Sequence, residues 1–407
     1  MKCWNPQTEI VENRGDVVIA NQMNGSWMRV SEETFGAVEC LRKIQDGDRV
    51  EFEDKEDEEY LASVMEFLER TKALIGEEKI SAQNKTVSIE TTHRCNLHCV
   101  HCCVDADHTE KSGELDTEEM KAILKKCAAW NPRSIMLSGG EPLLRKDFEE
   151  LLCYLREIYP GKIIVSTNGT LVTEEKAKIL AKNADQIDLS VDGVDEETTS
   201  KVRGSGVFDK VMRAIKRLQE NGFTNLSLSI ATADRNEYLE ERFDQLCEKL
   251  LVRPVKRKFS PVGRGEKSKE LFSEKTEKES YVPESFKKDD LQEAFGVCSC
   301  SAGKRELFIS YDGTVYPCPS FISGECDMGN IRETDSLEEL IVRAGIDIRG
   351  RLKEKLREFA GDRCENCKVR LFCWTCPGQI TEIRTKEAFD DRCRQVRGIY
   401  EKRVWGG

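Results

Sequence analysis

Residues 93–108, HRCNLHCVHCCVDADH, concentrate the side chains that could bind a metal. This stretch holds Cys95, Cys99, Cys102 and Cys103, and it also holds all 4 histidines of the chain. Thiolates and imidazoles bind iron-sulfur clusters, zinc and other transition metals. The stretch therefore predicts a metal centre, and the spacing of its cysteines indicates which kinds are possible.

Two metal centres are compatible with this spacing. Cys95, Cys99 and Cys102 form C-x3-C-x2-C. Three thiolates could hold three irons of a [4Fe–4S] cluster and leave the fourth iron open. The alternative is a zinc site that uses the same cysteines with one histidine of the stretch. Cys103 does not fit the cluster spacing, and we expect it to be a buried thiol or one that only supports the ligands.

The composition narrows the classes of protein. The chain has 407 residues, 34% of them charged, and a net charge of −12, so we expect no nucleic-acid partner. It shows no apolar run of membrane-spanning length and no signal peptide, so we expect a cytoplasmic protein without a membrane partner. In a reducing compartment, clustered cysteines indicate metal sites. Cysteines outside these clusters are instead predicted to be core residues: Cys3, Cys40, Cys127, Cys153 and Cys247. Of these, Cys127 and Cys247 lie at helical spacing with apolar residues.

Strand and helix patterns alternate through the middle of the chain. The strands are predicted at residues 86–90, 133–138, 162–166, 186–190, 225–231 and 255–259. The helices between them are predicted near residues 116–129, 146–158, 173–182, 206–220 and 238–249. Such repeated units predict an α/β fold with a parallel sheet and right-handed crossovers. Six of them predict a partial (β/α)6 barrel, similar to a TIM barrel, with its chemistry at the carboxyl ends of the strands.

The sequence predicts four domains. Residues 1–82 combine strand-like pieces with two amphipathic helices, which predicts a small winged-helix-like α+β domain. Residues 83–263 form the barrel, and the charge-dense residues 264–297 are predicted to be a linker or bridging region. Residues 298–407 are rich in cysteine and poor in apolar pattern. We therefore expect this last domain to need metal in order to fold.

Motifs that follow successive strands resemble the radical S-adenosylmethionine (SAM) superfamily. SGGEP (residues 138–142) follows the second barrel strand, STNGT (166–170) the third and LSVDG (189–193) the fourth, and RGSG begins at Arg203. The resemblance implies a [4Fe–4S] cluster on the three spaced cysteines, with SAM on the open iron. It also implies reductive cleavage of SAM to a 5′-deoxyadenosyl radical. This series of motifs argues against the zinc alternative.

The resemblance also implies which residues contact SAM. Glu141 would accept a hydrogen bond from the SAM amino group, and Arg203 would pair with the SAM carboxylate. His101, at a position that is often aromatic in the superfamily, would lie against adenine. The whole implied set is Gly139, Gly140, Glu141, Pro142, Ser166, Asn168, Ser190, Arg203 and His101. The sequence identifies no catalytic acid or base.

The C-terminal cysteines resemble the SPASM extension of this superfamily, which carries two auxiliary [4Fe–4S] clusters. The ligands implied for auxiliary cluster I are Cys298, Cys300, Cys318 and Cys376. The ligands implied for auxiliary cluster II are Cys364, Cys367, Cys373 and Cys393. The spacing before Cys376 is one residue shorter than the family pattern, and without Cys298 cluster I would have an open iron. Two structural zinc sites are the alternative.

Across nearly the whole chain these parts resemble radical SAM–SPASM maturases of ribosomally made peptides, of the sactipeptide and ranthipeptide type. The resemblance implies that residues 1–82 bind the leader of a cysteine-rich precursor peptide by strand addition. It implies hydrogen abstraction from the peptide and a thioether between a cysteine sulfur and a carbon. The alternatives are a carbon–carbon crosslink, a protein-modifying maturase of the anaerobic sulfatase-activating type, and a non-catalytic cluster-carrying scaffold. The implied cofactors are three [4Fe–4S] clusters and SAM, with flavodoxin or ferredoxin as reductant.

Overall fold

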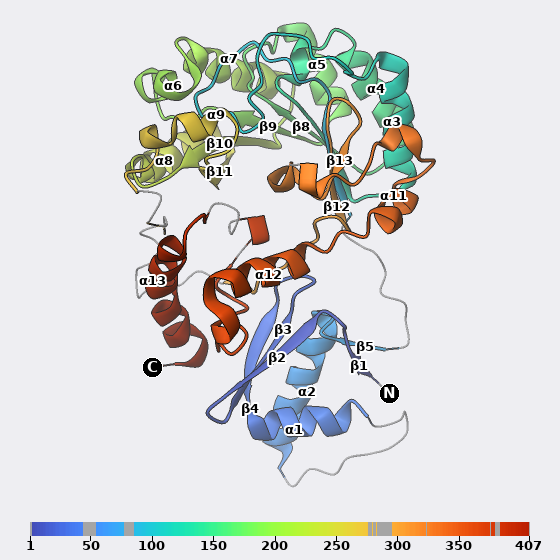
Figure 1. Cartoon of the computed structure of the whole chain (residues 1–407). Helices are drawn as coiled ribbons and strands as arrows, with labels where there is room; N and C mark the ends of the chain where they lie inside the picture. The colour runs from blue at the N-terminus through green and yellow to red at the C-terminus, as the bar shows by residue number, and fades with distance from the viewer. Residues whose placement is uncertain are drawn as a thin grey trace. The chain divides into compact units, whose positions relative to one another are not determined.

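The computed structural model describes residues 2–43, 54–76, 85–275, 279, 282, 295–322, 324–374, 376–378 and 383–406. The chain groups into two compact units, and each is described by itself (Figure 1). Unit 1 comprises Met1–Ser81, Lys275–Ser301 and Asp347–Gly407, and unit 2 comprises Ala82–Glu274 and Ala302–Ile346. The four domains expected from the sequence are a different division of the chain and stay a prediction. Among the described residues, no helix is both long and apolar enough to cross a bilayer.

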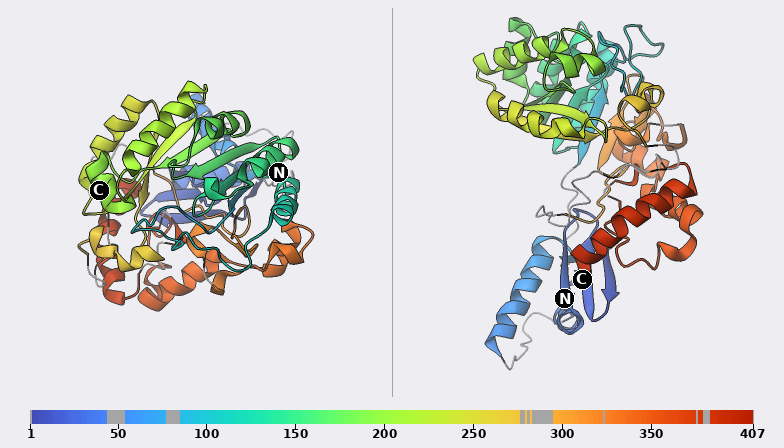
Figure 2. Two further views of the ribbon diagram at one scale, coloured as in Figure 1. Left: turned by 90° about the horizontal axis from the view of Figure 1, so that it is seen from above. Right: turned by 90° about the vertical axis from the view of Figure 1, so that its left-hand side faces the viewer.

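Unit 2 is built on an eight-stranded sheet in the order β11-β10-β9-β8-β7-β6-β12-β13. The six parallel strands of the barrel, in chain order, are β6 (Thr86–Glu90), β7 (Ser134–Ser138), β8 (Lys162–Thr167), β9 (Gln186–Ser190), β10 (Leu226–Thr232) and β11 (Arg253–Lys258). The longer helices between them are α3 (Thr117–Ala129), α4 (Phe148–Ile158), α5 (Glu174–Asn183), α6 (Glu196–Arg203), α7 (Val207–Glu220) and α8 (Glu240–Leu250). The view from above in Figure 2 shows helices of this unit along the outer side of the sheet. The predicted α/β fold with a partial (β/α)6 barrel is confirmed.

The strands and helices of the barrel share one apolar core. Alternate strand residues such as Ile89 and Leu137 are fully buried against the helices, as the period of two requires. The predicted apolar face of α3 is also confirmed, since Met120 and Cys127 belong to the same core. Helix α6 was not predicted; it begins at Glu196, and the side chain of the preceding Asp195 caps its first turn.

Part of the cysteine-rich region joins the barrel sheet. Strand β12 (Glu306–Ile309) pairs in parallel with β6, and β13 (Val315–Tyr316) returns antiparallel beside β12. Leu307 and Ile309 of β12 are fully buried in the core of the barrel. The shortage of core residues expected after residue 298 therefore does not apply to this segment. The remaining elements of unit 2 are η1 (Pro142–Leu144), η2 (Glu237–Leu239), α9 (Arg264–Lys267), η3 (Lys269–Leu271), η4 (Pro319–Phe321), η5 (Gly324–Cys326), η6 (Ile331–Glu333) and α11 (Leu337–Ala344).

Unit 1 contains the predicted N-terminal α+β domain. Its three-stranded antiparallel sheet has the order β2-β3-β4, and a separate strand pair joins β1 to β5. The elements are β1 (Cys3–Trp4), β2 (Thr8–Asn13), β3 (Asp16–Asn21), β4 (Trp27–Ser31), α1 (Glu32–Leu41), α2 (Lys55–Arg70) and β5 (Leu74–Ile75). Val17 and Ile19 of β3 pack against Leu61 and Leu68 of α2. One face of the sheet is therefore covered by the helices of its own domain.

The opposite face of this sheet packs against C-terminal residues of the same unit. Val18 and Ala20 of β3 share a core with Phe372 and Tyr400. The C-terminal elements are α12 (Ile348–Ala360), η7 (Gly361–Arg363) and α13 (Lys386–Trp405). The N-terminal domain thus shares a core with the region in which auxiliary clusters are predicted.

Candidate metal centres

The three spaced cysteines lie in the loop between β6 and α3 (residues 91–116, here called the cluster loop). Cys95 and Cys99 are buried, with 8% and 9% of their surface exposed, and Cys102 is partly buried. Burial raises the pKa of Cys95 to about 11, and the neighbouring Cys99 and Cys102 add to this increase. Burial likewise raises the pKa of Cys99, with a contribution from Cys102. The structure therefore brings the three predicted ligands close enough to interact.

Backbone hydrogen-bond donors point at two of these sulfurs. The N–H of Leu97 donates to Cys95 Sγ at 3.4 Å, and the N–H of Ala106 donates to Cys102 Sγ at 3.3 Å. Hydrogen bonds to sulfur stabilise the thiolate ligands of iron-sulfur clusters and tune them. Among the residues that the structure describes, no three Cys, His, Asp or Glu side chains already form a metal cage. Three neighbouring thiols with backbone donors beside them fit a cluster that would be held by three protein ligands.

The histidines of the cluster loop have other positions and partners. His93 Nδ1 lies 2.9 Å from a carboxylate oxygen of Glu90, and His101 Nε2 lies 2.9 Å from one of Asp192. The other two histidines of the loop are exposed to solvent. These contacts weaken the alternative of a zinc site with one histidine ligand.

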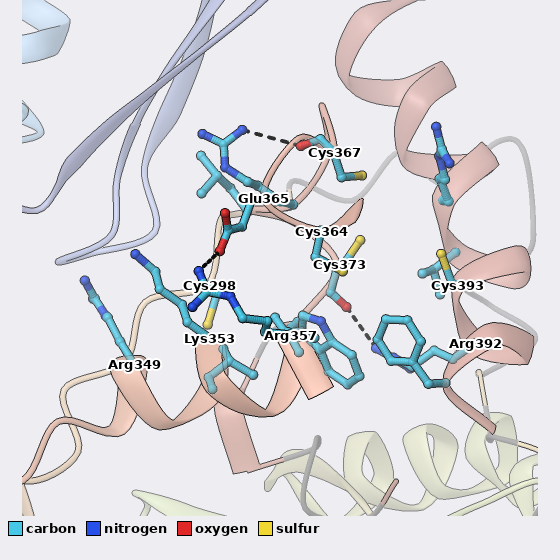
Figure 3. A pocket seen from close by; sticks show the side chains of 18 of the residues that line it. Cys298, Arg349, Lys353, Arg357, Cys364, Glu365, Cys367, Cys373, Arg392 and Cys393 are labelled. Atoms are coloured by element: carbon cyan, nitrogen blue, oxygen red, sulfur yellow. Dashed lines mark hydrogen bonds and ion pairs between the residues drawn. The ribbon is translucent and has the colours of Figure 1, made fainter. Parts of the chain in front are cut away.

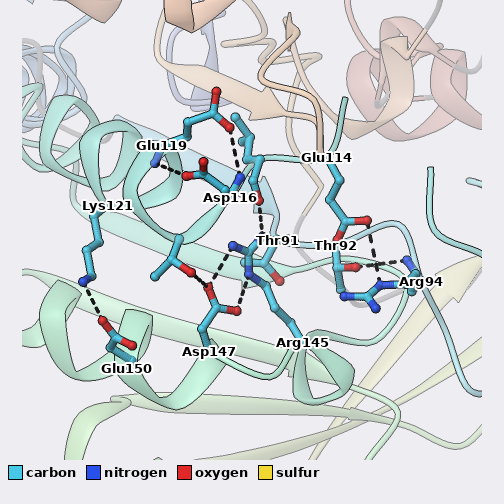
Figure 4. A network of polar contacts seen from close by, with 12 residues as sticks. Thr91, Thr92, Arg94, Glu114, Asp116, Glu119, Lys121, Arg145, Asp147 and Glu150 are labelled. Atoms are coloured by element: carbon cyan, nitrogen blue, oxygen red, sulfur yellow. Dashed lines mark hydrogen bonds and ion pairs between the residues drawn. The ribbon is translucent and has the colours of Figure 1, made fainter. Parts of the chain in front are cut away.

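Arg145 holds both ends of the cluster loop (Figure 4). Its Nη1 donates to the backbone oxygens of Thr91 and Leu115, both at 2.8 Å. Its Nε and Nη2 donate to the two carboxylate oxygens of Asp147 at 2.8 and 2.9 Å. Burial alone would raise the pKa of Asp147, but hydrogen bonds from Arg145 and Thr117 bring it below its usual value. One buried guanidinium therefore fixes the two points at which the loop leaves the barrel.

Arg264 contacts the middle of the cluster loop. Its Nη1 donates to the backbone oxygen of Cys99 at 2.9 Å and its Nη2 to that of Ala106 at 2.5 Å. Its Nε lies 2.9 Å from a carboxylate oxygen of Asp105. The sequence placed Arg264 at the start of a charged linker, yet only 8% of its surface is exposed. This end of the predicted linker packs on the cluster loop, and much of the rest of residues 264–297 lies outside the described residues.

Two glycines allow the turn after β7 to pack directly on the cluster loop. Gly139 has a φ of 151°, and a Cβ added there would lie 2.5 Å from the backbone oxygen of Thr92. A Cβ on Gly140 would lie 2.4 Å from the backbone oxygen of Arg94. No side chain fits at these distances. The backbone of this turn therefore packs directly on the cluster loop, and the predicted contacts of Gly139 and Gly140 with SAM stay predictions.

Glu141 is fully buried and joins two loops. Its Oε1 accepts hydrogen bonds from Thr167 Oγ1 at 2.6 Å and from the N–H of Leu143 at 3.1 Å. Its Oε2 accepts from the N–H of Asn168 at 2.7 Å. Burial raises the pKa of Glu141, although these hydrogen bonds oppose the increase. The carboxylate therefore fixes the turn after β7 to the loop after β8, where Asn168 also brings its Nδ2 to 3.9 Å from Cys95 Sγ.

The other predicted SAM contacts lie at the same edge of the sheet. Ser166 and Ser190 stand near the carboxyl ends of β8 and β9, and Ser190 Oγ accepts a hydrogen bond from Ser229 at 3.3 Å. Pro142 is buried and begins η1. The structure brings these residues to the expected edge of the barrel, and their contacts with SAM stay predictions.

Arg203 and His101 share the carboxylate of Asp192. Arg203 Nε donates to Asp192 Oδ2 at 2.6 Å, and Arg203 Nη1 lies 3.9 Å from Cys99 Sγ. Burial alone would raise the pKa of Asp192, but Arg203 and His101 hold it well below its usual range. The sequence assigned no role to Asp192, and its only local signal is its place in LSVDG after β9. The predicted contacts of Arg203 and His101 with SAM are not tested by these interactions.

Unit 1 contains a cavity of 370 Å³ (Figure 3). The four cysteines predicted for auxiliary cluster II all line it: Cys364, Cys367, Cys373 and Cys393. Burial raises the pKa of Cys373 to about 12, and the other three thiols contribute to its environment. Guanidinium groups line the same cavity, among them Arg392, whose Nη2 donates to the backbone oxygen of Cys373 at 3.0 Å. Four neighbouring thiols with cationic groups around them fit a cluster of four thiolate ligands, which carries negative charge.

Three of the four cysteines predicted for auxiliary cluster I belong to unit 1. Burial raises the pKa of Cys298 to about 12, and Cys300 and Cys376 add to this increase. These three thiols therefore interact, which supports Cys298 as a fourth ligand. Cys318 belongs to unit 2, where it is buried, and its role as a ligand stays a prediction.

Comparisons with known proteins identify two domains of the chain. Residues 89–246 match the radical SAM superfamily, and residues 298–368 match SPASM, an iron-sulfur cluster-binding domain. Fe-coproporphyrin III synthase of Methanosarcina barkeri is 44% identical over 133 residues, which are 32% of this chain and 33% of that protein. Mycofactocin maturase MftC of Mycolicibacterium smegmatis is 30% identical over 260 residues, which are 60% of this chain and 66% of that protein. The chain thus spans a third of the first relative and just under two thirds of the second.

Among solved structures, SuiB of Streptococcus suis bound to S-adenosylmethionine has a similar fold. The TM-score is 0.56 at 16% identity, and the match covers 94% of this chain and 97% of SuiB. SuiB bound to its precursor peptide SuiA matches with a TM-score of 0.54. The chain therefore carries a radical SAM domain with the radical SAM fold, followed by a SPASM domain, and it is an enzyme that uses [4Fe–4S] clusters and S-adenosylmethionine.

Proposed function

We propose that this enzyme modifies a ribosomally made precursor peptide and forms a thioether between a cysteine sulfur and a carbon of that peptide. The observation that carries the proposal is the N-terminal α+β domain, which shares a core with the cysteine-rich part of unit 1. This domain adds an antiparallel sheet with an edge strand, to which an extended peptide can pair. The similarity to a mycofactocin maturase and to the fold of SuiB, which binds its precursor peptide SuiA, supports the same proposal.

The sheet of this domain offers a place for a peptide strand. β4 lies at one edge of the order β2-β3-β4, and within the described residues no strand pairs with its outer side. The other edge strand, β2, is contacted by Lys368, whose Nζ donates to the backbone oxygen of Glu12 at 2.7 Å. An open edge strand can bind an extended peptide through main-chain hydrogen bonds. We therefore propose β4 as the strand that binds the leader.

The residues of the cluster loop and of the barrel edge would act as a rigid holder for cluster and SAM. Cys95, Cys99 and Cys102 would hold three irons, and the open iron would bind SAM. When bound and reduced, this pair supplies a 5′-deoxyadenosyl radical that removes a hydrogen atom from the peptide. Arg145 and Arg264 would keep the loop fixed, and the buried Glu141 would orient the SAM amino group.

The cellular setting follows from the same chemistry. Low-potential clusters and free thiols need a reducing compartment, so we propose a cytoplasmic enzyme. A flavodoxin or ferredoxin would supply the electron.

The test is an anaerobic reaction of the reconstituted enzyme with SAM, dithionite and a synthetic precursor peptide. The peptide is taken from a short reading frame beside the coding sequence. Loss of two hydrogens with one thiol blocked against alkylation is expected and would establish the thioether. Loss of two hydrogens with every thiol still reactive would show a carbon–carbon crosslink instead. Conversion of a cysteine to formylglycine would show chemistry of the sulfatase-maturase type.

Two cysteine variants provide the matched control. Cys95→Ala removes a predicted ligand, and we expect it to abolish SAM cleavage and to lower the iron content by one cluster. Cys103→Ala removes a thiol outside the ligand spacing, and we expect SAM cleavage and iron content to persist. If Cys95→Ala still cleaves SAM, the assignment of the open-iron cluster is wrong.

A second candidate function rests on the first relative above. Fe-coproporphyrin III synthase is 44% identical over 133 residues, so a tetrapyrrole substrate is the competitor to a peptide. Because Fe-coproporphyrin III is the product named for that relative, the same enzyme is incubated with iron tetrapyrrole precursors and SAM. Formation of Fe-coproporphyrin III, with no change in the peptide, would replace the proposed function.

A further inference from the structure

Segments from the N-terminal sheet and from the cysteine-rich region meet at one side chain in unit 1. Arg349, in the first turn of α12, is partly buried and lines the cavity shown in Figure 3. Its Nη1 donates to the side-chain oxygens of Gln7 and Gln22 at 2.6 and 3.0 Å. Its Nη2 donates to the backbone oxygen of Gln22 at 2.5 Å and to that of Cys300 at 3.3 Å. One guanidinium therefore joins two turns of the N-terminal sheet to a predicted cluster ligand.

The turn that follows β3 makes further contacts with the segment before Cys298. The N–H of Val297 donates to the backbone oxygen of Gly25 at 3.0 Å. Trp27 Nε1 donates to the backbone oxygen of Phe295 at 2.7 Å. Gly25 has a φ of 82°, and a Cβ on Gly296 would lie 2.8 Å from the Gly25 oxygen, so the two backbones pack directly. Residues 295–300 therefore follow the turn between β3 and β4 closely.

The same segment leads to both predicted auxiliary centres. The N–H of Cys298 donates to the backbone oxygen of Leu371 at 2.9 Å, two residues before Cys373. Cys298 and Arg349 both line the cavity shown in Figure 3. Hydrogen bonds and charges beside the ligands set the reduction potential of an iron-sulfur cluster.

We propose that Arg349 is a positioning residue for auxiliary cluster I, and that it couples the turns of the N-terminal sheet to the potential of this cluster. The guanidinium holds the Cys298–Cys300 segment through the Cys300 carbonyl and places a fixed positive charge beside these ligands. Loss of that charge disfavours the reduced, more negative cluster and lowers its potential. Coupling of this kind is reciprocal, so a ligand that moves these turns also changes the cluster. The effect of a leader peptide on the cluster rests on the proposed function, whereas the effect of Arg349 on the cluster potential does not.

The test uses the full chain with reconstituted clusters and needs neither a peptide nor SAM cleavage. Redox titrations followed by electron paramagnetic resonance give the potential of each cluster, and the signal that changes on adding SAM identifies the SAM-binding cluster. Amide hydrogen exchange reports on residues 22–27. We expect Arg349→Gln to shift one auxiliary cluster to a more negative potential and to raise exchange in this turn by about tenfold or more, with the SAM-responsive cluster unchanged.

Two further variants separate positioning from charge. Arg349→Lys keeps the positive charge but cannot reach four acceptors, so we expect a nearly normal potential with faster exchange in the turn. Arg351→Gln removes an exposed arginine from the same helix and should change neither readout. Wild-type potentials and exchange in Arg349→Gln would overturn the proposal.

A variant on the sheet covers the case in which Arg349→Gln does not assemble its clusters. Gln7→Ala removes one acceptor of the guanidinium and leaves Arg349 in place. We expect it to shift the potential of the same auxiliary cluster, by less than Arg349→Gln would. An unchanged potential in Gln7→Ala, with faster exchange in the turn, would show that the sheet and the cluster are not coupled. Because these readouts do not involve substrate, they can fail or succeed independently of the proposed function.

Discussion

Removal of the Arg145 side chain should loosen the cluster loop at both of its ends. In Arg145→Ala, the backbone oxygens of Thr91 and Leu115 lose their donor, and Asp147 loses two hydrogen bonds and its positive partner. The side chain of Arg145 is 5% exposed and that of Asp147 is 20% exposed. The pair is therefore shielded from solvent for the most part.

The expected cost follows from this burial. Removing one partner of a buried ion pair costs about 3–5 kcal/mol, because the other charge stays buried without compensation. The partial exposure of Asp147 places the expected loss near the lower end, at about 3 kcal/mol. Such a loss raises the equilibrium constant for opening the loop by roughly a hundredfold.

Amide hydrogen exchange measures this opening directly. The N–H groups of Cys95 and Leu115 are bonded to the backbone oxygens of Asp107 and Tyr311, and both should exchange roughly a hundredfold faster in Arg145→Ala. Arg145→Lys keeps the charge but not the forked geometry, so an intermediate increase is expected. Arg156→Ala, which removes a more exposed arginine bonded to Gly161, should leave the loop unchanged. Exchange of the loop amides within about twofold of wild type in Arg145→Ala would refute the reasoning.

The same pair predicts how the loop responds to acid. The pKa of Asp147 is lowered in the folded chain, so its contribution is complete above the usual pKa of an aspartate, about 3.9. This contribution is lost as the pH falls through the lower folded value. In Arg145→Ala, Asp147 lacks its positive partner and takes up a proton at a higher pH than in wild type. The difference in stability between the two proteins should therefore be largest at neutral pH and shrink as the pH falls towards about 4. Acid unfolding of the metal-free chain, followed by circular dichroism, checks this. A difference that does not depend on pH would show that Asp147 is not the partner that matters.

Two further changes test the packing of the chain. Gly140→Ala would place a Cβ against the backbone oxygen of Arg94, so the reconstituted variant should lack the iron of one cluster. Gly398 lies in the middle of α13, where an added Cβ meets no other atom. Gly398→Ala should therefore stabilise the helix by about 1 kcal/mol and raise the melting temperature accordingly. Cys127 is fully buried, and burial raises its pKa to about 12, whereas Cys40 is exposed. A thiol reagent should therefore label Cys40 in the native chain and Cys127 only after unfolding. Peptide mass mapping of the labelled protein measures this.

Features that are local in the sequence were predictable. The strand pattern, the C-x3-C-x2-C spacing and the glycines after β7 are each defined by residues within a few positions of one another. The predicted core positions are confirmed for Cys127 and Cys247, whose neighbours at helical spacing are apolar. The same prediction is wrong for Cys3 and Cys40, which are exposed and for which the prediction did not rest on such a spacing. Local periodicity reflects which face of an element is buried, and burial is what these patterns record.

Features that depend on residues distant in the sequence were not predictable. Arg264 lies in a charge-dense run, where nothing distinguishes a buried guanidinium from a solvated one, yet it bonds to residues more than 150 positions earlier. Asp192 is one turn residue among many until Arg203 and His101 are seen to share it. The contacts of Arg349 join the two ends of the chain in the same way. Such pairs are set by tertiary packing, which no local spacing reveals.

The position of β12 predicts where the chain can be cut. β12 pairs with β6, and Leu307, Ile309 and Val315 of the β12–β13 hairpin are each 0% exposed within the core of unit 2. Exposing three such side chains costs about 1.5–3 kcal/mol each, a large part of the 5–15 kcal/mol that stabilises a typical domain. A cut after residue 274 also leaves β6 with an unpaired edge, which favours aggregation. We therefore expect residues 82–274 to aggregate when produced alone and residues 82–346 to elute as a single species in size-exclusion chromatography. A monodisperse, folded fragment of residues 82–274 would show that the barrel folds without the β12–β13 hairpin. In that case the domain boundary near residue 263, expected from the sequence, would be correct.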